Sequence, residues 1–530
     1  MSFGGAVAEL LEGVRSGQIK SRAELGRAKN RAAKKFSLSG VPSTVQIISA
    51  ATKEEREKFK GILNKKPTRG LSGVNVVAVM TKPYDCVGKC IYCPVSLVPG
   101  KKTPKSYTGR EPSTMRGLMF NFNPYKIVEN RLEQYRLTNN ESSKLELILQ
   151  GGTFPALPFS HQKYFVKRCF DAVLGKKTPS LGEAKRLCET SGRRVVGLTI
   201  ETRPDWCRKK EINRMLSLGV TRVELGVQVP DDRVYGLTNR GHSVSDVVSS
   251  TSLLKDSCFK VCYHLMPGLY GSSFENDLKN FKRVFSESEF KPDMIKIYPT
   301  LVIEKTVLHS LWQKGLYSPM PVPDAVRLIV ELKKFVPEFV RIMRVQRDIP
   351  STVIAGGAKQ TNLRQLVELE QKRANVACRC IRCREAGLNA ARNRIDLSSA
   401  VPELVRFDYG ASGGKEVFLS IEDKAHDVLF GFCRLRIPGN PFRKEITARA
   451  GLIRELHVYT RSIGVGQKPT ELEFQHRGFG KQLFLEAQRI AQEEFDANKL
   501  VVIAGIGVKD YYKKNFGCID DGAFVSKALE

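Results

Sequence analysis

Long apolar runs are missing from this chain of 530 residues. No stretch approaches the ~18 consecutive apolar residues of a membrane-spanning helix, so we expect no membrane partner. The first residues also lack an uninterrupted apolar core with a convincing cleavage site, which argues against a secretory signal. They are rich in arginine, as transit peptides are, but Glu9, Glu12 and Glu24 weaken that interpretation. These absences favour a cytoplasmic protein.

Acidic residues are scarce relative to basic ones. The chain has 86 Lys and Arg against 55 Asp and Glu, a formal net charge of +31. Lys and Arg release counterions when they neutralise phosphates, so the imbalance favours a nucleic-acid partner over a merely basic surface or an acidic lipid. Residues 1–70 are expected to be a helical arm that binds RNA, with a solvated helix face as the alternative. Its cationic residues are Lys20, Arg22, Arg27, Lys29, Arg31, Lys34 and Lys35.

The thirteen cysteines do not form a disulfide framework of the secreted kind. Six of them fall in two tight clusters of a large basic chain, which favours metal binding in a reducing compartment. The seven histidines form no pair with metal-ligand spacing. The cysteines without a motif are expected to be buried thiols. They are Cys169, Cys188, Cys207, Cys258, Cys262, Cys433 and Cys518.

Residues 71–360 alternate between apolar strands and helices. An early strand is predicted at 75–80, and helices at 161–174, 209–218, 243–255, 273–286 and 323–336. The alternation predicts an α/β fold, an open or closed barrel of six parallel β/α units. The further strands are predicted at 145–150, 195–201, 222–228, 260–266, 294–299 and 339–345.

The first cysteine cluster, Cys86, Cys90 and Cys93, has C-x3-C-x2-C spacing after the early strand. Three thiolates on one loop suit a [4Fe–4S] cluster with one iron free to chelate S-adenosylmethionine (SAM). One electron then cleaves the sulfonium and yields a 5′-deoxyadenosyl radical. Zinc is the alternative, although a structural zinc usually takes four protein ligands and no fourth is nearby. The arrangement resembles the signature of the radical-SAM superfamily.

Four motifs fall at the predicted carboxyl ends of strands, where barrel enzymes place their sites. They are QGGTF (150–154), GLTIETRPD (197–205), ELGVQ (224–228) and HLMPGL (264–269). The first resembles the superfamily's glycine motif, in which small residues let the backbone approach the methionyl amino group. Each motif alone is weak, but together they predict one rim. The expected cofactor-binding residues are Gly151, Gly152, Glu201, Arg203 and Gln228.

Residues 399–530 carry a second α/β pattern. Strands are predicted at 455–459 and 501–506, with an amphipathic helix at 480–495 between them. The preceding FQHRGFG (474–480) resembles the Q/R-x-x-G-x-G/A signature of GNAT acetyltransferases. Its glycines let backbone N–H groups face the pyrophosphate of coenzyme A at a helix N-terminus. We therefore predict a GNAT-type domain after the barrel.

A radical-SAM barrel followed by a GNAT domain resembles the family of the Elongator catalytic subunit, from about residue 40 to the end. The resemblance implies a transferase that installs a carboxymethyl-type group at C5 of wobble uridine-34, in the anticodon of tRNA. It implies that the radical takes hydrogen from the methyl of acetyl-CoA, that the carbon radical adds to C5, and that water hydrolyses the thioester. Matching blocks lie at 66–83, 105–116, 199–207, 296–304, 346–357 and 451–459.

The resemblance also assigns roles residue by residue. Lys144 matches a lysine associated with acetyl-CoA, and Tyr512 a tyrosine near the thioester. Without the family, a solvent-facing lysine and a core aromatic are the ordinary interpretations. The implied catalytic residues are Cys86, Cys90, Cys93, Lys144 and Tyr512. The implied coenzyme A wall and loop are Glu455, Leu456, His457, Val458, Gln475, Gly478, Phe479, Gly480, Lys481 and Gln482.

Between the two domains, residues 361–398 form an Arg-rich linker with Cys378, Cys380 and Cys383. The C-x-C-x2-C spacing indicates a structural zinc site whose fourth ligand is unknown, with reduced buried thiols as the alternative. The element resembles stand-alone archaeal or bacterial family members. Its arginines suit tRNA phosphates: Arg373, Arg379, Arg382, Arg384, Arg392 and Arg394.

Two features beside Cys86 depart from the family pattern. Its spacer to Cys90 has three residues, shorter than is common, and Pro94-Val95-Ser96 replaces Pro-Gly-Gly. A protein lysine acetyltransferase is the competing hypothesis, but a structural cluster would not need the rim motifs. A non-catalytic tRNA-binding scaffold is disfavoured by the intact cysteines. Further expected partners are an electron donor and either a second copy or accessory subunits.

Overall fold

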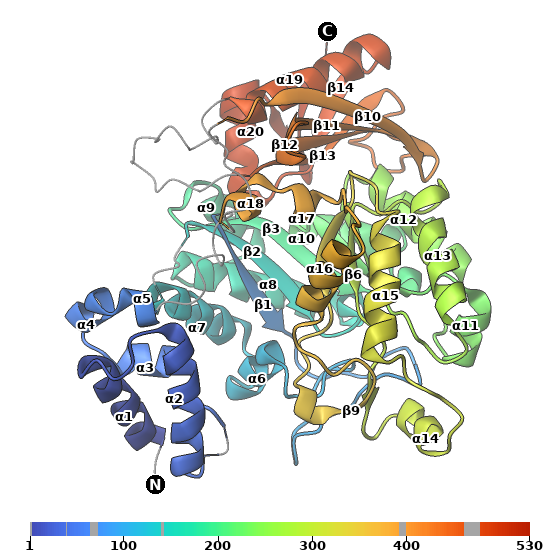
Figure 1. Cartoon of the computed structure of the whole chain (residues 1–530). Coiled ribbons are helices and arrows are strands. Elements are labelled where there is room, and N and C mark those ends of the chain that lie inside the picture. The colour runs from blue at the N-terminus through green and yellow to red at the C-terminus, as the bar shows by residue number, and fades with distance from the viewer. Residues whose placement is uncertain are drawn as a thin grey trace.

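The computed structural model describes residues 3–38, 40–63, 73–138, 142–391, 399–459 and 478–529. Figure 1 shows a helical N-terminal part, a central parallel sheet wrapped by helices, and a second sheet at the opposite end. Within the described residues, none of the helices combines the length and apolar character that crossing a bilayer requires. The predicted α/β class, with a barrel followed by a GNAT-type sheet, is confirmed.

The central sheet has seven parallel strands in the order β1-β2-β3-β4-β5-β6-β8. Each predicted strand is present, and its ends differ from the predicted ones by at most two residues. Six β/α units would give six strands, whereas this sheet has seven. It is a partial barrel, because β1 and β8 do not pair. The strands are β1 (Val74–Met80), β2 (Lys144–Gln150), β3 (Arg194–Thr202), β4 (Arg222–Gln228), β5 (Lys260–Leu265), β6 (Met294–Ile297) and β8 (Arg341–Val345).

Helices pack against the outside of this sheet, because their apolar faces and the strands' outward side chains share one core. A short antiparallel pair, β7 (Val302–Ile303) and β9 (Ile354–Gly356), lies beyond the strands' carboxyl ends. The helices are α6 (Pro112–Met119), α7 (Pro124–Leu137), α8 (Phe159–Leu174), α9 (Leu181–Thr190), α10 (Lys209–Leu218), α11 (Asp232–Leu237), α12 (Val244–Asp256), α13 (Phe274–Ser286), α14 (Val307–Gln313) and α15 (Val322–Lys333).

The N-terminal part is helical, as predicted, with its own small apolar core. It rests on the barrel through contacts between α3 and α7. The cationic side chains predicted for the arm are exposed, except that Lys29 is half-buried and donates to the Thr44 hydroxyl at 3.3 Å. The helices are α1 (Phe3–Arg15), α2 (Arg22–Lys35), α3 (Thr44–Ala50), α4 (Lys53–Lys58) and α5 (Lys60–Leu63).

The second sheet has the order β10-β11-β12-β13-β14-β16-β15. Strands β13 and β14 run parallel and pair only from Ala450 to Ile453, so the later part of β13 separates from β14. The elements are β10 (Glu403–Ala411), β11 (Gly414–Asp423), β12 (Val428–Ile437), β13 (Ala450–Val458), α19 (Phe479–Arg489), β14 (Lys499–Val502), α20 (Lys509–Phe516), β15 (Ile519–Asp521) and β16 (Phe524–Ala528).

Two predicted elements of the second domain differ in detail from the structure. The strand predicted at 501–506 stops at Val502, because the chain then packs on the barrel: a Cβ on Gly505 would lie 2.0 Å from the Val196 carbonyl oxygen. The helix predicted at 480–495 is α-helical only to Arg489 and continues as a π-turn from Ile490 to Glu494.

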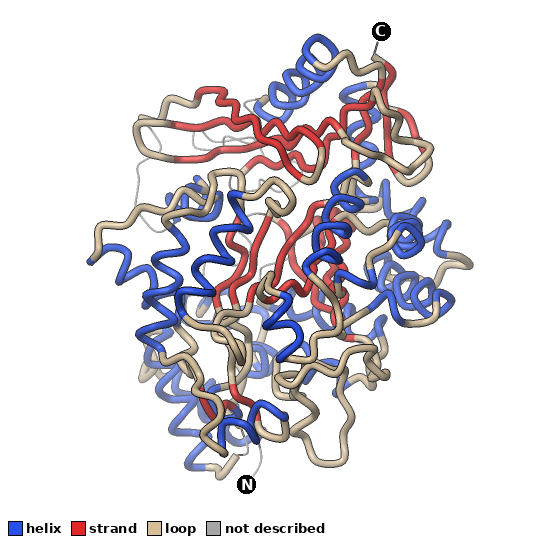
Figure 2. The backbone as a smooth tube through the Cα atoms, turned by 90° about the vertical axis from the view of Figure 1, so that its right-hand side faces the viewer, coloured by secondary structure: helices blue, strands red, loops and turns tan. Residues whose placement is uncertain are grey.

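The second sheet sits over the amino ends of the barrel strands, as Figures 1 and 2 both show. Short helices of the linker, α16 (Leu363–Arg373), α17 (Ile381–Arg384) and α18 (Ala386–Ala391), connect the two sheets. The contact is densely charged: Arg436 binds Asp256, and Arg454 binds Asp293, with all four side chains buried. The two sheets are therefore joined by buried ion pairs.

Candidate active site at the carboxyl end of the barrel

One pocket opens at the carboxyl ends of the barrel strands, and the first cysteine cluster lines it. Cys86, Cys90 and Cys93 follow β1 on an irregular loop and are free, partly exposed thiols. Unlike the second cysteine cluster, their sulfurs do not all lie within 4.8 Å of one another among the described groups. Wider spacing suits three corners of a cubane better than one ion, because each sulfur then binds a different iron.

Each of the three sulfurs has a hydrogen-bond donor or hydroxyl beside it. The Gly88 amide donates to Cys86 Sγ at 3.4 Å, and Arg240 Nη1 donates to Cys90 Sγ at 3.4 Å. Cys93 Sγ lies 3.6 Å from the Ser106 hydroxyl. Donors of this kind stabilise thiolates, the ligand form of cysteine. The loop therefore fits a [4Fe–4S] cluster despite its short spacer.

Gly151 and Gly152 end β2 with φ of +144° and +88°. A Cβ on Gly151 would lie 2.0 Å from the Thr81 hydroxyl oxygen, so no other residue fits without rearrangement. Gly152 lines the pocket beside the cluster loop. The backbone here is free to approach a bound methionyl group, as the glycine motif predicts.

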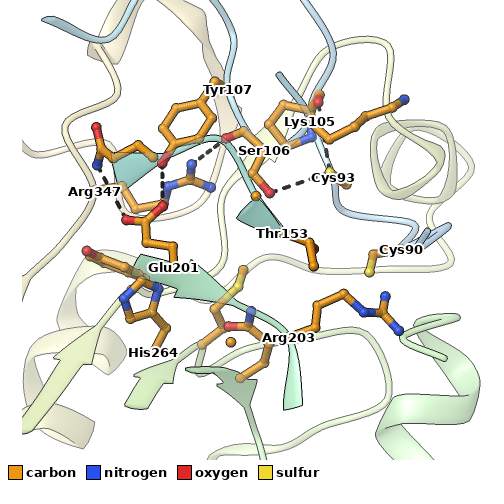
Figure 3. Close-up of a pocket in the computed structure, with 18 of the residues that line it drawn as sticks. Cys90, Cys93, Lys105, Ser106, Tyr107, Thr153, Glu201, Arg203, His264 and Arg347 are labelled. Atoms are coloured by element: carbon orange, nitrogen blue, oxygen red, sulfur yellow. Dashed lines mark hydrogen bonds between the residues drawn. The ribbon is translucent and has the colours of Figure 1, made fainter. Parts of the chain in front are cut away.

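The next two predicted rim residues, Glu201 and Arg203, also line this pocket (Figure 3). Glu201 Oε2 accepts from the Tyr107 hydroxyl at 2.8 Å, and burial together with this carboxylate raises the pKa of Tyr107 well above its usual range. Arg203 holds Asp205 by two hydrogen bonds of 2.8 and 2.9 Å. Its Nη1 is buried without a partner among the described residues, which leaves a donor for a ligand carboxylate.

Gln228, at the end of β4, takes φ of +68°, a left-handed conformation uncommon for a non-glycine residue. Its side-chain carbonyl oxygen is buried without a donor in the described part of the chain. Strain of this kind concentrates at functional sites. The carbonyl oxygen is available to a hydroxyl or amine of a bound cofactor.

The floor of the pocket carries a charged group that the motif search did not single out. Glu224 Oε2 lies 2.8 Å from His264 Nε2 and also binds Lys296 Nζ. Burial raises the pKa of Glu224, but the charges of Lys296, His264 and Arg222 outweigh it and hold that pKa well below its usual range. The carboxylate therefore stays ionised inside the barrel. Only the alternation of side chains along β4, β5 and β6 could have revealed this group from sequence.

A second candidate site lies where β13 separates from β14. Residues 455–458 pair with β12 on one side, while β14 no longer reaches them on the other. This leaves a backbone edge that a pantetheine chain can use for hydrogen bonds, the arrangement expected of the wall residues. Glu455 binds Arg434 at 2.9 Å, and His457 lies 4.2 Å from the ring of Tyr459. Leu456 and Val458 are partly buried against the core of the second sheet.

The predicted pyrophosphate loop is described only from Gly478 onward, so Gln475 lies outside the described residues. Gly478 precedes α19 with φ of +78°, and the Gln482 amide donates back to its carbonyl. Phe479 packs on Phe430, and a Cβ on Gly480 would lie 3.3 Å from the Tyr511 hydroxyl. Lys481 is exposed on the first turn of α19.

The predicted catalytic residues divide between these two sites. Lys144 begins β2 at its amino end, where its side chain is exposed, and partial desolvation and the charge of Arg194 lower its pKa. Six residues at ~3.3 Å each separate it from the end of β2, so it lies ~20 Å from the cluster loop. Tyr512 packs in the core of the second sheet against Phe484 and Phe516, where burial raises its pKa.

The three cysteines of the second cluster lie as close together as ligands of a single metal ion do. The sulfurs of Cys378, Cys380 and Cys383 lie within 4.8 Å of one another, and no fourth His, Cys, Asp or Glu joins them in the described chain. Of the neighbouring arginines, Arg384 is buried in an ion pair with Glu422 and cannot reach a tRNA phosphate, whereas Arg373 and Arg379 are exposed. Arg392 and Arg394 lie outside the described residues.

The partial barrel, the three-cysteine loop and the glycine-ended strand define a radical-SAM enzyme domain, which holds a [4Fe–4S] cluster and SAM. In agreement, residues 81–281 match the model of the radical SAM superfamily, and residues 292–374 match that of the Radical_SAM C-terminal domain. Residues 3–71 match the model of the ELP3 N-terminal domain.

Curated relatives cover nearly the whole chain. The tRNA uridine(34) acetyltransferase of Methanocaldococcus infernus is 50% identical over 493 residues, which cover 92% of each chain. Elongator complex protein 3 of Homo sapiens is 39% identical, covering 100% of this chain and 97% of that one. The solved structure of Methanocaldococcus infernus Elp3 lacking residues 1–46 matches with a TM-score of 0.77 at 46% identity, over 87% of this chain and all of that one. The chain belongs to this family of tRNA uridine(34) acetyltransferases and Elongator complex protein 3.

Proposed function

We propose that this protein modifies tRNA by joining the acetyl group of acetyl-CoA to C5 of the wobble uridine-34, leaving a carboxymethyl-type group. Its relatives are named for action on uridine 34 of tRNA. The net charge of +31 and the exposed cationic face of α2 suit a polyanionic substrate. An anticodon loop already presents its wobble base unstacked, which lowers the energy needed to reach a buried pocket.

One observation supports the proposal: the two candidate sites lie at opposite ends of the same barrel. The cluster pocket lies at the carboxyl ends of the strands, and β13 belongs to the second sheet, which lies over their amino ends (Figure 1). Charged side chains line the barrel between its two ends: Arg222, at the amino end of β4, is ion-paired with Glu224, which lines the pocket. A reaction that combines a radical with an acyl group needs such a shared interior.

In this proposal the residues of the pocket have separate roles. The cluster and SAM, when bound, supply the 5′-deoxyadenosyl radical that takes a hydrogen atom from the acetyl methyl. Cys86, Cys90 and Cys93 hold the iron, and Gly152 and Arg203 orient the amino and carboxylate groups of SAM. The buried Tyr107 ring covers one side of Glu201, to which its hydroxyl donates, and Arg347 lies over that ring.

At the other end, Glu455 to Val458 and the first turn of α19 bind coenzyme A. Lys144 is placed at the same end and, being partly desolvated, suits the phosphates of coenzyme A. Tyr512 supports this wall from the core. We also propose that Cys378, Cys380 and Cys383 hold a structural zinc, because three thiol sulfurs within 4.8 Å match its ligand preference.

Four functional parts follow along the chain in this proposal: a tRNA-binding arm at 1–70, the radical-SAM domain at 71–360, the zinc-bearing linker at 361–398 and the acetyltransferase-like domain at 399–530. An electron donor is required, and a second copy or accessory subunits are further candidate partners.

The test is anaerobic reconstitution with iron and sulfide, followed by incubation with SAM, acetyl-CoA, a reductant and tRNA. Nucleoside mass spectrometry should find uridine carrying an acetyl-derived two-carbon group when acetyl-CoA is labelled with ¹³C. Cys90→Ser should abolish it, whereas Cys169→Ser, a buried thiol remote from the pocket, should not. Modified uridine formed by Cys90→Ser would contradict the radical route.

A further inference from the structure

His264, on β5, lines the same pocket as the cysteine loop. Its side chain is largely enclosed, at 15% exposure, and Figure 3 shows it across the pocket from Cys90. Neither radical formation nor the binding of SAM, as proposed above, uses this histidine. Imidazole exchanges a proton near neutral pH more readily than other side chains do, so a histidine in a reaction pocket is a candidate acid or base.

The imidazole ring of His264 is held in one orientation. Its Nε2 lies 2.8 Å from Glu224 Oε2, and the ring of Tyr298 packs edge-on against it, with ring centroids 5.4 Å apart and planes at 78°. Tyr298 is fixed in turn, because its amide donates to the Leu265 carbonyl at 2.7 Å. The Nε2 edge of the ring therefore faces Glu224, and the other nitrogen, Nδ1, lies on the edge that is turned away from it.

Glu224 determines which nitrogen of the ring carries the proton. Lys296 and Arg222 are both ion-paired with this carboxylate, so it stays ionised and can only accept hydrogen bonds. Nε2 of His264 is therefore the protonated nitrogen, and Nδ1 of the neutral ring has a free lone pair. Among the described residues Nδ1 has no hydrogen-bond partner. An ionised carboxylate, an oriented imidazole and an open second nitrogen form the arrangement of a general base.

We propose that His264 is the general base for hydrolysis of the thioester, once the acetyl group has been joined to uridine. This inference rests on the proposed function. The acetyl methyl must enter this pocket to meet the radical, and its carbonyl carbon is only one bond, ~1.5 Å, away. The thioester that is cleaved therefore lies in the same pocket as His264.

The step needs water and no oxidant or reductant. Nδ1 of His264 accepts a proton from a water molecule while the water oxygen bonds to the carbonyl carbon. The carbon–sulfur bond then breaks, and the proton passes from Nδ1 to the leaving thiolate of coenzyme A. The products are a carboxymethyl group on uridine and free coenzyme A. Glu224 is a positioning residue, because it orients the ring and stabilises the imidazolium while that carries the extra proton.

The test uses the reconstituted full-length protein with SAM, a reductant, tRNA and ¹³C-labelled acetyl-CoA. His264→Gln keeps an amide donor for Glu224 but has no basic nitrogen. It should form 5′-deoxyadenosine as the wild type does, whereas carboxymethyluridine should fall by about 100-fold or more, the usual contribution of a general base. Nuclease digests analysed by mass spectrometry should then contain uridine that is still joined to coenzyme A through the labelled acyl group.

Two further variants separate a base from a structural role. His264→Ala should also accumulate the uridine joined to coenzyme A, and added imidazole should convert it to carboxymethyluridine, because the lost ring leaves space for a free base. His309→Gln removes a half-buried histidine of α14 that lies outside the lining of the pocket, and it should behave as the wild type does with and without imidazole.

Carboxymethyluridine formed by His264→Gln at the wild-type rate would overturn the inference, and so would its loss without the form joined to coenzyme A. Loss of 5′-deoxyadenosine in both His264 variants would also overturn it, because His264 would then serve SAM binding or the fold. The proposed function fails differently: the wild type would then yield no labelled uridine at all, and the inference would be contradicted with it.

Discussion

Arg454 of the second sheet donates hydrogen bonds from both terminal nitrogens to the carboxylate of Asp293 in the barrel, at 2.6 and 2.8 Å, and both side chains are buried. Arg454 sits at a bulge, where Arg434 faces Glu455 but Leu435 already faces Ile453. The bulge turns the Arg454 side chain toward the barrel and leaves Glu455 at the open edge of β13. One irregularity thus both fastens the two sheets and shapes the proposed acyl site.

Removing this arginine should therefore loosen the contact between the sheets. Arg454→Ala leaves Asp293 buried and without its main partner, which costs roughly 3–5 kcal/mol. Denaturant unfolding should report that loss, whereas Arg449→Ala, at an exposed ion pair with Asp496, should cost less than ~1 kcal/mol. Equal losses in the two variants would contradict the role of the buried pair.

Acid should weaken the same contact. Burial raises the pKa of Asp293, but Arg454 and Lys255 outweigh burial and hold that pKa well below its usual range. A carboxyl with a lowered folded pKa contributes stability above its unfolded pKa, near ~3.9, and loses it as pH falls further. As the pH falls below ~4, the free energy of unfolding should decrease more steeply for the wild type than for Asp293→Asn. Parallel pH profiles would show that Asp293 is not involved.

The glycine at the end of β2 should be irreplaceable for cofactor binding. Gly151→Ala places a Cβ 2.0 Å from the Thr81 hydroxyl oxygen and also strains a φ of +144°. Binding of SAM to the reconstituted protein should fall by at least about tenfold, because the backbone must shift. Gly175→Ala, with φ of +71° and open space around it, tests strain alone and should leave SAM affinity unchanged.

Arg240 should tune the iron–sulfur cluster. Its guanidinium donates to Cys90 Sγ and is fixed by the Gly226 carbonyl and by His242. A cation and a hydrogen bond beside a cluster sulfur favour the reduced state. Arg240→Gln should make the midpoint potential of the cluster more negative, by about 60 mV if the reduced state loses tenfold in stability. Redox titration followed by electron paramagnetic resonance measures this.

The control for that titration is Arg233→Gln, an exposed arginine whose side chain donates to the Gly271 carbonyl. It should leave the potential unchanged. Equal potentials for wild type and Arg240→Gln, with full iron content in both, would mean that the contact to Cys90 has no electronic effect.

Local patterns predicted much of this structure. The strands, the cluster loop and the glycine motif each depend on residues close in sequence, so spacing and apolar periodicity were sufficient. The rim motifs began at Glu224 and His264, but the interaction of these two residues with Lys296 was not predicted, because it assembles from three strands. Arg240 was missed for the same reason, since 150 residues separate it from Cys90. The strand at 501–506 was too long because Gly505 meets the barrel, a contact invisible in sequence.

The central claim is that the radical formed at the cysteine loop acts on the acetyl group. The most direct measurement uses acetyl-CoA with a fully deuterated methyl, SAM, reductant and tRNA, and follows deuterium in 5′-deoxyadenosine by mass spectrometry. We predict one deuterium in the 5′-deoxyadenosine of wild-type reactions. Unlabelled 5′-deoxyadenosine, formed in amounts equal to modified uridine, would contradict the account.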